Sequence, residues 1–441
     1  MSRMKVLVAG VGMTRFQKPR PGGDDYPEFA QLAIRRALAD ANIDYSDIGQ
    51  VFAGYVYGDS TCGQRAVYGV GLTGVPIVNV NNNCSTGSSA LYLGRQCILS
   101  GQADCVLVVG FEKMASGSLG SNFSDRTNPL DSHIDAMSRS FDVVPNVPFA
   151  PQLFGNAGKQ HMIQFGTTRE QIAKIAVKNH SHSVNNPYAQ FREEYSLEQV
   201  LNSPKVHEPL TKLQCCPTSN GAGAAVLVSE AFAMSHGLLD DCVEIVAQTM
   251  ATDGPTSLGP KANPINVVGF EMTAKAATQA YKMAGISPEQ IAVAEVHDCF
   301  STNELITYEA LEFSPLGKAG MYIDNNKFTY GGNVVVNPSG GLISKGHPLG
   351  ATGLAQCAEL VWQLRGHAQK RQVKNATYAL QHNLGLGGAC VITIYKKLTN
   401  RPALGTLNSD PSILEKWENS GRDPAIRPFA WDSTCRTKSK L

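Results

Sequence analysis

Short apolar runs alternate with helical patterns along the first part of this chain, and this alternation limits the available folds most strongly. Segments that alternate at these lengths form βαβ units, whose strands lie in a parallel sheet covered by helices. Gly101 follows the second helical pattern, at the position where glycine commonly ends a helix. The predicted fold class is therefore α/β. The expected strands are KVLVAGVG (5–12), VFAGYVYG (51–58), VPIVNVN (75–81) and DCVLVVG (104–110), and the expected helices cover 26–41 and 85–100.

A second series of the same kind begins near Cys242. Its strands and helices follow an order similar to that of the first series, so we predict a duplicated α/β core. One of its helices begins with STNE (301–304), which is a capping-box pattern. The expected strands are CVEIVAQTM (242–250), IAVAEVHDCF (291–300), TYALQHN (377–383) and ACVITIY (389–395), and the other expected helices cover 269–284 and 352–364.

The stretch between the two series has a different composition. Over 116–211, Pro, Asn, Ser, His and Met are frequent and strand patterns are scarce, although TREQIAKIAVKNHSHSV (168–184) indicates a helix. We interpret this stretch as an insertion over the sheet, after which GAGAAVLVS (221–229) returns to a buried strand. The predicted division is a first half made of 1–115 and 212–238, an inserted loop domain over 116–211, a second half over 239–398, and a tail over 399–441.

The composition argues against several classes of protein. The formal net charge is +1 and no long block of like charge occurs, so we expect no nucleic-acid partner. No apolar run reaches the roughly 18 to 20 residues that span a bilayer, and the N-terminus lacks a secretory signal pattern. The 11 cysteines include no CxxC pair, which indicates reduced intracellular thiols and no metal motif. Ser439-Lys440-Leu441 matches the peroxisomal import signal, which an import receptor reads on an exposed tail.

Cys84 is the first candidate for chemistry. It lies in NNNCSTGSSA (81–90), where an expected strand ends and an expected helix begins. Unpaired N–H groups and the helix dipole at such a position lower the pKa of a thiol and favour the reactive thiolate. The small residues that follow leave room for a substrate or for a second backbone. A buried structural cysteine is the alternative interpretation.

His297 and Cys299 form the second candidate, within VHDCF (296–300). Residues two apart on a strand point to the same face, and open α/β sheets place their sites at the carboxyl ends of strands. A histidine beside a thiol can exchange and hold protons. Asp298 should face the other way and is interpreted as structural. A buried histidine beside a packing cysteine is the alternative.

Two glycine-rich stretches complete the set. His347 lies in NPSGGLISKGHPLGATG (337–353), directly before an expected helix, where glycines allow another backbone or a ligand to approach closely. LGLGG (384–388) separates the last two expected strands, and such a turn either presents N–H groups to an oxyanion or is a plain hairpin. Gly10-Val11-Gly12 lacks the third glycine of a dinucleotide-binding loop, so we reject a nucleotide role.

These four stretches, in this order, resemble the thiolase superfamily over residues 4–398. GHPLGATG (346–353) is similar to the thiolase GHP motif, HDCF (297–300) stands where most thiolases have Asn-Glu-Ala-Phe, and QHNLGLGG (381–388) replaces the usual final Cys-x-Gly stretch. The combination resembles the sterol carrier protein 2-type thiolases, which are peroxisomal or glycosomal. The resemblance implies duplicated βαβαβαββ halves in a five-layered α-β-α-β-α arrangement, with a large loop domain inserted in the first half. About forty residues follow the core, so we do not expect the C-terminal lipid-binding domain of some relatives.

The resemblance also implies a reaction, the thiolysis of 3-ketoacyl-CoA to acetyl-CoA (or propionyl-CoA) and a shortened acyl-CoA, or the reverse condensation. Cys84 would attack the 3-keto carbon while His347 takes its proton. His297 and His347 would donate to the enolate oxygen, and Cys299 would protonate the enolate carbon. Asn383 and Leu384 stand where ordinary thiolases have their acid/base cysteine, and Cys390 lies beyond the turn, so Cys299 is the available thiol.

A second oxyanion would be held by the N–H of Cys84 and by one from the glycine turn. We choose Gly387 for the latter, although a shift of one residue selects Leu386. The expected co-substrate is coenzyme A, with contacts from the insertion that we do not assign, and no bound cofactor or metal is expected. The resemblance implies a homodimer, with a tetramer as the alternative. Two competing functions are a decarboxylating ketoacyl synthase, which needs no second thiol, and a non-catalytic acyl-CoA or lipid-binding protein.

Overall fold

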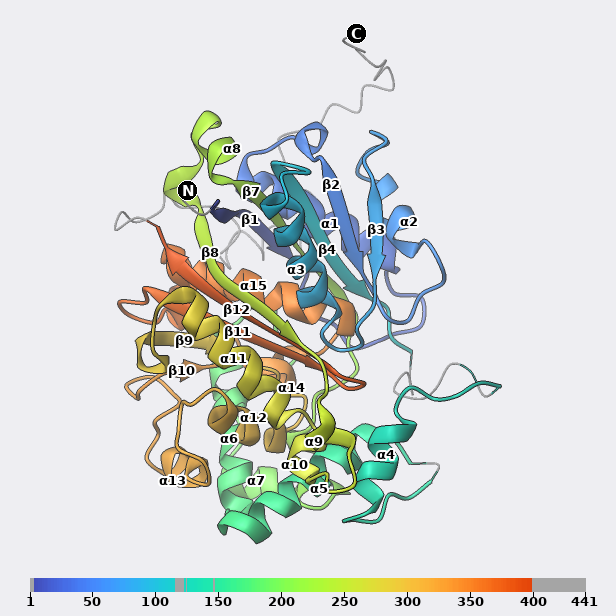
Figure 1. Ribbon diagram of the computed structural model, residues 1–441, viewed down its shortest axis with the longest axis vertical. Coiled ribbons are helices and arrows are strands. Elements are labelled where there is room, and N and C mark those ends of the chain that lie inside the picture. The colour runs from blue at the N-terminus through green and yellow to red at the C-terminus, as the bar shows by residue number, and fades with distance from the viewer. Residues whose placement is uncertain (1–3, 116–122, 124, 146, 399–441) are drawn as a thin grey trace.

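The computed structural model describes residues 4–115, 123, 125–145 and 147–398. Their main feature is a ten-stranded sheet with the order β10-β9-β11-β12-β8-β1-β7-β4-β2-β3 (Figure 1). The strands of the first half are β1 (Val6–Met13), β2 (Gln50–Gly54), β3 (Ile77–Val80), β4 (Cys105–Glu112) and β7 (Gly221–Ser229). The strands of the second half are β8 (Val243–Ala251), β9 (Ile291–Glu295), β10 (Val335–Val336), β11 (Tyr378–Gly385) and β12 (Ala389–Lys397).

The two halves repeat one topology. In the first half β2 pairs in parallel with β3 and β4, and β7 pairs antiparallel with β4 and β1. In the second half β9 pairs in parallel with β10 and β11, and β12 pairs antiparallel with β11 and β8. The halves join where β1 meets β8 through the pairs Leu7↔Glu244 and Val8↔Val243. The expected α/β class and the duplication are therefore confirmed.

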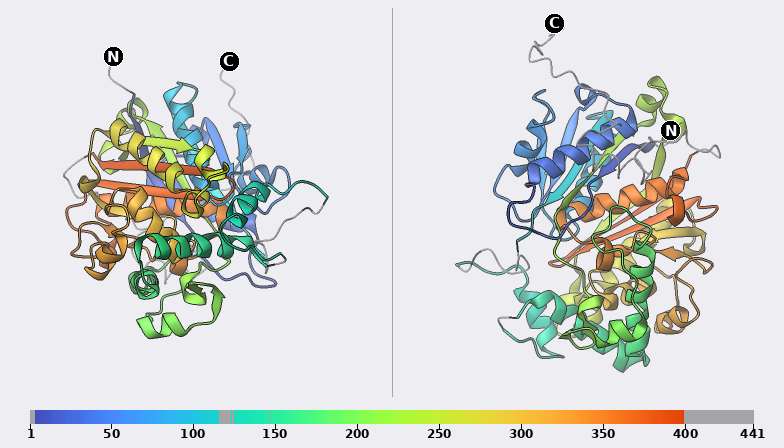
Figure 2. Two further views of the ribbon diagram at one scale, coloured as in Figure 1. Left: turned by 60° about the horizontal axis from the view of Figure 1, so that its bottom comes forward. Right: turned by 180° about the vertical axis from the view of Figure 1, so that it is seen from behind.

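Helices cover both outer faces of this sheet and fill the space between its halves. Side chains of β4 alternate with period two: Val106 and Val108 share a core cluster with α3 and α15, whereas Leu107 and Val109 share one with α1. A third cluster packs α11 on β11 and β12. The layers are, in order, α1, the strands of the first half, α3 together with α15, the strands of the second half, and α11. Helix α1 is visible from behind as a blue helix (Figure 2). These helices are α1 (Tyr26–Ala41), α3 (Thr86–Leu99), α11 (Phe270–Ala284) and α15 (Leu349–Arg365).

The insertion follows β4 and is mostly helical. It contains α4 (Asp131–Ser138), α5 (Phe149–Phe165), α6 (Arg169–Ser183), α7 (Leu197–Asn202), β5 (Lys205–His207) and β6 (Leu210–Thr211). Although it belongs to the first half in sequence, α5 and α6 pack on α12 and α6 packs on α14, in the second half (Figure 1). The remaining helices are α2 (Cys62–Tyr68), α8 (Glu230–Ser235), α9 (Pro255–Leu258), α10 (Pro264–Val267), α12 (Ser301–Ala310), α13 (Ala319–Asp324) and α14 (Gly341–Lys345). The division into 1–115 with 212–238, 116–211 and 239–398 stays a prediction, and the tail over 399–441 lies outside the described residues.

No helix among the described residues is both long and apolar enough to cross a bilayer.

Candidate active site

Cys84 lies in a tight turn between β3 and α3, and the polar residues around it hold that turn. The preceding residue, Asn83, has φ +50°, in the left-handed region that asparagine tolerates better than most residues. The Asn82 N–H donates to Thr86 Oγ1 at 2.9 Å, and the Thr86 hydroxyl donates to Asn83 O at 2.6 Å. The run of asparagines and hydroxyls therefore supplies the partners that an unusual turn needs to present one thiol.

Small residues bring the turn of Cys84 against the loop of His347. A Cβ added to Gly87 on α3 would lie 2.7 Å from Gly350 O on α15. A Cβ added to Gly353 would lie 2.4 Å from Ser88 N, so the two helices touch backbone to backbone at their first turns. The space left by the small residues after Cys84 is thus used by a second backbone, one of the two uses that the sequence suggests.

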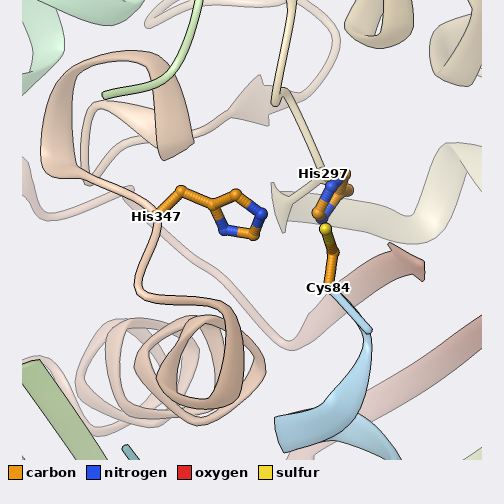
Figure 3. A group of neighbouring side chains, drawn as sticks. All are labelled: Cys84, His297 and His347. Carbon is orange, nitrogen blue, oxygen red and sulfur yellow. The ribbon is translucent and has the colours of Figure 1, made fainter. Parts of the chain in front are cut away.

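Cys84, His297 and His347 come together (Figure 3). One ligand atom from each of the three side chains lies within 4.8 Å of the other two. The two imidazole rings meet edge to face, with centroids 5.0 Å apart and an angle of 81° between their planes. Residues that are up to 263 positions apart in the chain (347 − 84 = 263) thus share one site.

The loop that carries His297 differs from the prediction. β9 ends at Glu295, so His297 and Cys299 follow the strand instead of lying on it. The reason is that the Val296 N–H donates to Asn337 Oδ1 at 2.8 Å and Asn303 Nδ2 donates to His297 O, which turns the chain out of the sheet. Asp298 is structural, as expected, because its carboxylate accepts the N–H of Leu342 at 2.6 Å.

The predicted capping box at the start of α12 is wrong. The N-cap of this helix is Phe300, and no side chain caps it. Glu304 is buried and instead accepts hydrogen bonds from Lys178 Nζ, Asn179 Nδ2 and Asn337 Nδ2. A buried carboxylate that is needed by a cation and two amides is not available to cap a helix.

Burial controls the charges of the trio. Burial and, to a lesser extent, the charge on the nearby Glu112 carboxylate together raise the pKa of the Cys84 thiol to about 12. The expectation of a lowered pKa from the helix N-terminus is therefore wrong, because desolvation of the thiolate outweighs the backbone hydrogen bond that favours it. Burial also lowers the pKa of His347 to about 3 and that of His297 well below its ordinary value. Near neutral pH the site holds a protonated thiol and two neutral imidazoles, so the thiol needs a base.

His347 is oriented to act as that base. Its Nδ1 lies 2.6 Å from Thr352 Oγ1, and the Thr352 hydroxyl donates its single proton to Pro348 O at 3.1 Å. Nδ1–H must then donate to Thr352, which leaves Nε2 without a proton. The buried Nε2 has no hydrogen-bond partner among the described residues. It is therefore free to accept the thiol proton.

Cys299 lies beside the trio together with Cys216, which the sequence analysis missed. Burial raises the pKa of the Cys299 thiol, and negative charge on Cys216 and then on Cys84 raises it further. The Cys216 N–H donates to Cys299 O at 2.9 Å, next to an antiparallel bridge between Cys215 and Phe300. The adjacent pair Cys215-Cys216 offered no recognisable motif, so only the fold places a third thiol here.

The glycine turn reaches the site through other residues than Gly387. Gly387 has φ +90°, is exposed, and an added Cβ there would meet only Leu130 Cδ2, at 3.7 Å. In contrast, a Cβ on Gly385 would lie 2.4 Å from Asn82 O and 3.1 Å from Ser85 N. Leu386 O accepts a hydrogen bond of 3.0 Å from Asn83 Nδ2. The part of the turn that packs on the Cys84 loop is therefore Gly385 and Leu386.

Glu112, at the end of β4, is a second residue that the sequence analysis missed. Its buried carboxylate accepts the N–H of Tyr57 at 2.8 Å, of Val56 at 3.1 Å and of Gly350 at 3.0 Å. Burial raises the pKa of Glu112 to about 7, against the effect of these hydrogen bonds. It ties the first turn of α15, next to His347, to the loop after β2. A carboxylate at the end of an otherwise apolar strand was the signal available in the sequence.

Among the described residues, the trio is also the group whose side chains have the composition and spacing to share a metal ion. Thiolate and imidazole ligands suit zinc. A metal would have to displace the proton of the Cys84 thiol, and the raised pKa of this thiol opposes that. A thiol that faces an unprotonated imidazole is instead the arrangement of an activated nucleophile.

Comparison with known proteins decides the family. A model of the thiolase N-terminal domain matches residues 6–231, and a model described as thiolase C-terminal domain-like matches residues 263–396. The chain belongs to the thiolase family. Rabbit (Oryctolagus cuniculus) sterol carrier protein 2 is 60% identical over 394 residues, which are 89% of this chain and 72% of the relative. The chain is thus a thiolase of the sterol carrier protein 2 type, an acyltransferase, as its motifs imply.

Solved structures share the thiolase fold. The chain aligns with an Ltp2-ChsH2(DUF35) aldolase at a TM-score of 0.75 and 21% identity, over 90% of this chain and 98% of that one. It aligns with human mitochondrial 3-ketoacyl-CoA thiolase in complex with CoA at a TM-score of 0.67 and 20% identity, over 90% and 98% of the two chains. At these identities the likeness concerns the fold.

Proposed function

We propose that this thiolase cleaves 3-ketoacyl-CoA with coenzyme A through an acyl group on Cys84. The observation that carries the proposal is the trio itself, in which one atom of the thiol and one of each imidazole lie within 4.8 Å of each other. A protonated thiol beside an imidazole with a free nitrogen is a nucleophile with its base. The first step is transfer of the Cys84 proton to His347 Nε2, with attack of the sulfur on the 3-keto carbon.

Cleavage of the C2–C3 bond then leaves the enolate of acetyl-CoA, or of propionyl-CoA. Its oxygen lies between the two imidazoles, where His297 and the now protonated His347 donate hydrogen bonds. Donors held in a dry site are effective because they need no reorganisation when the charge develops. Cys299 then protonates the enolate carbon, and its raised pKa keeps this thiol protonated until that step. Coenzyme A finally gives its thiol proton to the Cys299 thiolate and takes the acyl group from Cys84, whose sulfur recovers its proton from His347.

The second oxyanion site, used when the acyl group moves on and off Cys84, needs backbone donors. We propose the Cys84 N–H for one of them, and Gly385 in place of Gly387 for the glycine turn. The support is the packing of Gly385 against the Cys84 loop, where an added Cβ would lie 3.1 Å from Ser85 N. Gly387 is exposed at the far side of the turn.

The competing functions differ in what they need from the site. A decarboxylating synthase has no use for Cys299, and a non-catalytic binding protein has no use for Cys84 with a free base beside it. The effect of charge on Cys84 on the pKa of Cys299 supports two thiols acting together, and therefore supports thiolysis. The test is a thiolysis assay with coenzyme A across straight and 2-methyl-branched 3-ketoacyl-CoAs. Binding of acetoacetyl-CoA without turnover would favour the binding protein, and activity only with a malonyl-type donor would favour the synthase.

We further propose that two chains associate through the β3 edge of the sheet. β3 is an outer strand with half-exposed side chains, and Val78 is 41%, Tyr68 49% and Leu72 80% exposed near it. Exposed apolar side chains along an unpaired edge strand are typical of an interface. Sedimentation at several concentrations distinguishes dimer, tetramer and monomer, and a monomer throughout would contradict the proposal.

For the compartment, we propose import into peroxisomes or glycosomes through Ser439-Lys440-Leu441. These residues lie outside the described part of the chain, so the support is the tripeptide alone. A fluorescent protein that ends in the last residues of this chain should enter the organelle, and removal of Leu441 should leave it in the cytosol. Import that persists without Leu441 would contradict the proposed signal.

A further inference from the structure

Asn383 lies at the back of the active site, between the nucleophile and one of the histidines. It is on β11 and is fully buried. Its Nδ2 lies 3.1 Å from Cys84 O and 3.0 Å from His297 Nδ1. One amide thus contacts both the backbone of the nucleophile and the ring of the expected oxyanion donor, in the stretch where ordinary thiolases carry a cysteine.

A chain of buried hydrogen bonds fixes which way this amide faces. The Tyr395 hydroxyl donates to Gln381 Oε1 at 2.5 Å, which orients Gln381 so that its Nε2 donates to Gly353 O at 2.7 Å and to Ser88 Oγ at 2.8 Å. Because Ser88 receives this N–H, its own proton goes to Asn383 Oδ1 at 2.8 Å. Rotation of the Asn383 amide by half a turn would set Oδ1 against Cys84 O, which is an acceptor too.

The orientation of the amide determines the tautomer of His297. One N–H of Asn383 is used by Cys84 O, and the other points at His297 Nδ1, which must therefore accept. A neutral imidazole that accepts at Nδ1 carries its proton on Nε2. His347 has the opposite tautomer, because its Nδ1 donates to Thr352. The two rings, 5.0 Å apart, thus differ before any substrate binds: Nε2 of His297 can donate a hydrogen bond, and Nε2 of His347 can accept a proton.

We propose that Asn383 is a positioning residue that holds His297 as the Nε2–H tautomer, so that His297 donates to the enolate oxygen and cannot act as a base. Through its hydrogen bond to Cys84 O, the same amide also fixes the position of the nucleophile relative to His297. The inference rests on the proposed function for its consequence, but the tautomer itself is a property of the resting protein. It gives Asn383 a task in place of the acid/base chemistry of the absent cysteine.

The test has a spectroscopic and a kinetic part. In full-length protein with ¹⁵N- and ¹³C-labelled histidine, the His297 signals, assigned by their loss in His297→Gln, should report a proton on Nε2. In Asn383→Leu, which has nearly the same shape but no donor, this preference should be lost. Deuterium uptake from D₂O into the methyl group of acetyl-CoA, which needs the enolate, should fall about 100-fold or more, as for loss of an oxyanion donor. Acylation of Cys84 by acetyl-CoA should fall less than about tenfold, since it uses the other oxyanion site.

Asn156→Leu is the matched control, because Asn156 is also a buried asparagine that contacts a histidine, His207, at 2.8 Å. It should leave deuterium uptake within a few-fold of the parent. A parent protein with His297 protonated on Nδ1, or an Asn383→Leu variant with parental uptake, overturns the proposal. If the Asn383→Leu variant does not fold, the tautomer of the parent decides alone. A parent that takes up no deuterium while His297 carries Nε2–H contradicts the proposed function and leaves the tautomer established.

Discussion

Cys84→Ala should leave the protein without an acyl group after incubation with acetoacetyl-CoA, and should lower kcat of thiolysis about 10⁴-fold or more. The reason is that, of the thiols in the described part of the chain, Cys84 is the one grouped with His347, and covalent transfer cannot begin without a nucleophile. Losses of this size follow removal of the nucleophile in other covalent enzymes. Intact-protein mass spectrometry measures the acyl group directly, and the thiolysis assay measures the rate.

Cys97→Ala is a suitable control for Cys84→Ala. Cys97 is on the same helix, α3, and its side chain is buried in the core and not in the site. This variant should keep both acylation and turnover, with only the stability cost of a small cavity, about 1 kcal/mol. Stoichiometric acylation of Cys84→Ala at a different thiol, with turnover retained, would remove Cys84 from its role.

The sequence carried enough information for the framework of the site, because its signals are local. Apolar runs and helical patterns located most of the core strands and helices of both halves, although not β10 or α2. The small residues that follow Cys84 and His347 indicated helix starts that approach another backbone, and the contact of Gly87 with Gly350 has this geometry. A position at the start of a helix can be recognised from the residues that are next to it in the sequence.

What the sequence could not supply depends on neighbours distant in the chain. The pKa of Cys84 was expected to be low from the helix N-terminus, but desolvation of the thiol by its surroundings decides the direction of the shift. Cys216 joins the site through a loop, and Glu112 joins it through N–H groups of Tyr57, Val56 and Gly350, which the periodicity does not place beside β4. Asn383 was recognised only as the absence of a cysteine, since its partners Ser88 and His297 lie in other elements.

Cys299→Ala should separate the two halves of the reaction. The variant should still accept an acyl group on Cys84 from acyl-CoA, within about tenfold of the parent rate, because that step needs only Cys84, His347 and backbone donors. Carbon–carbon cleavage and deuterium uptake into acetyl-CoA should fall about 10²- to 10⁴-fold, the range for loss of a general acid or base. Burst kinetics with acetoacetyl-CoA and uptake by mass spectrometry measure the two steps.

Cys216→Ala is the decisive companion to Cys299→Ala, because desolvation raises the pKa of both thiols and charge on Cys84 raises the pKa of both further. If Cys299 is the proton carrier, Cys216→Ala keeps deuterium uptake while Cys299→Ala loses it. Loss in Cys216→Ala with retention in Cys299→Ala would transfer the role to Cys216. Loss in both variants with normal acylation would mean that the proton passes between the two sulfurs. Retention in both would show that neither thiol is indispensable as the proton carrier, and would contradict the role assigned to Cys299.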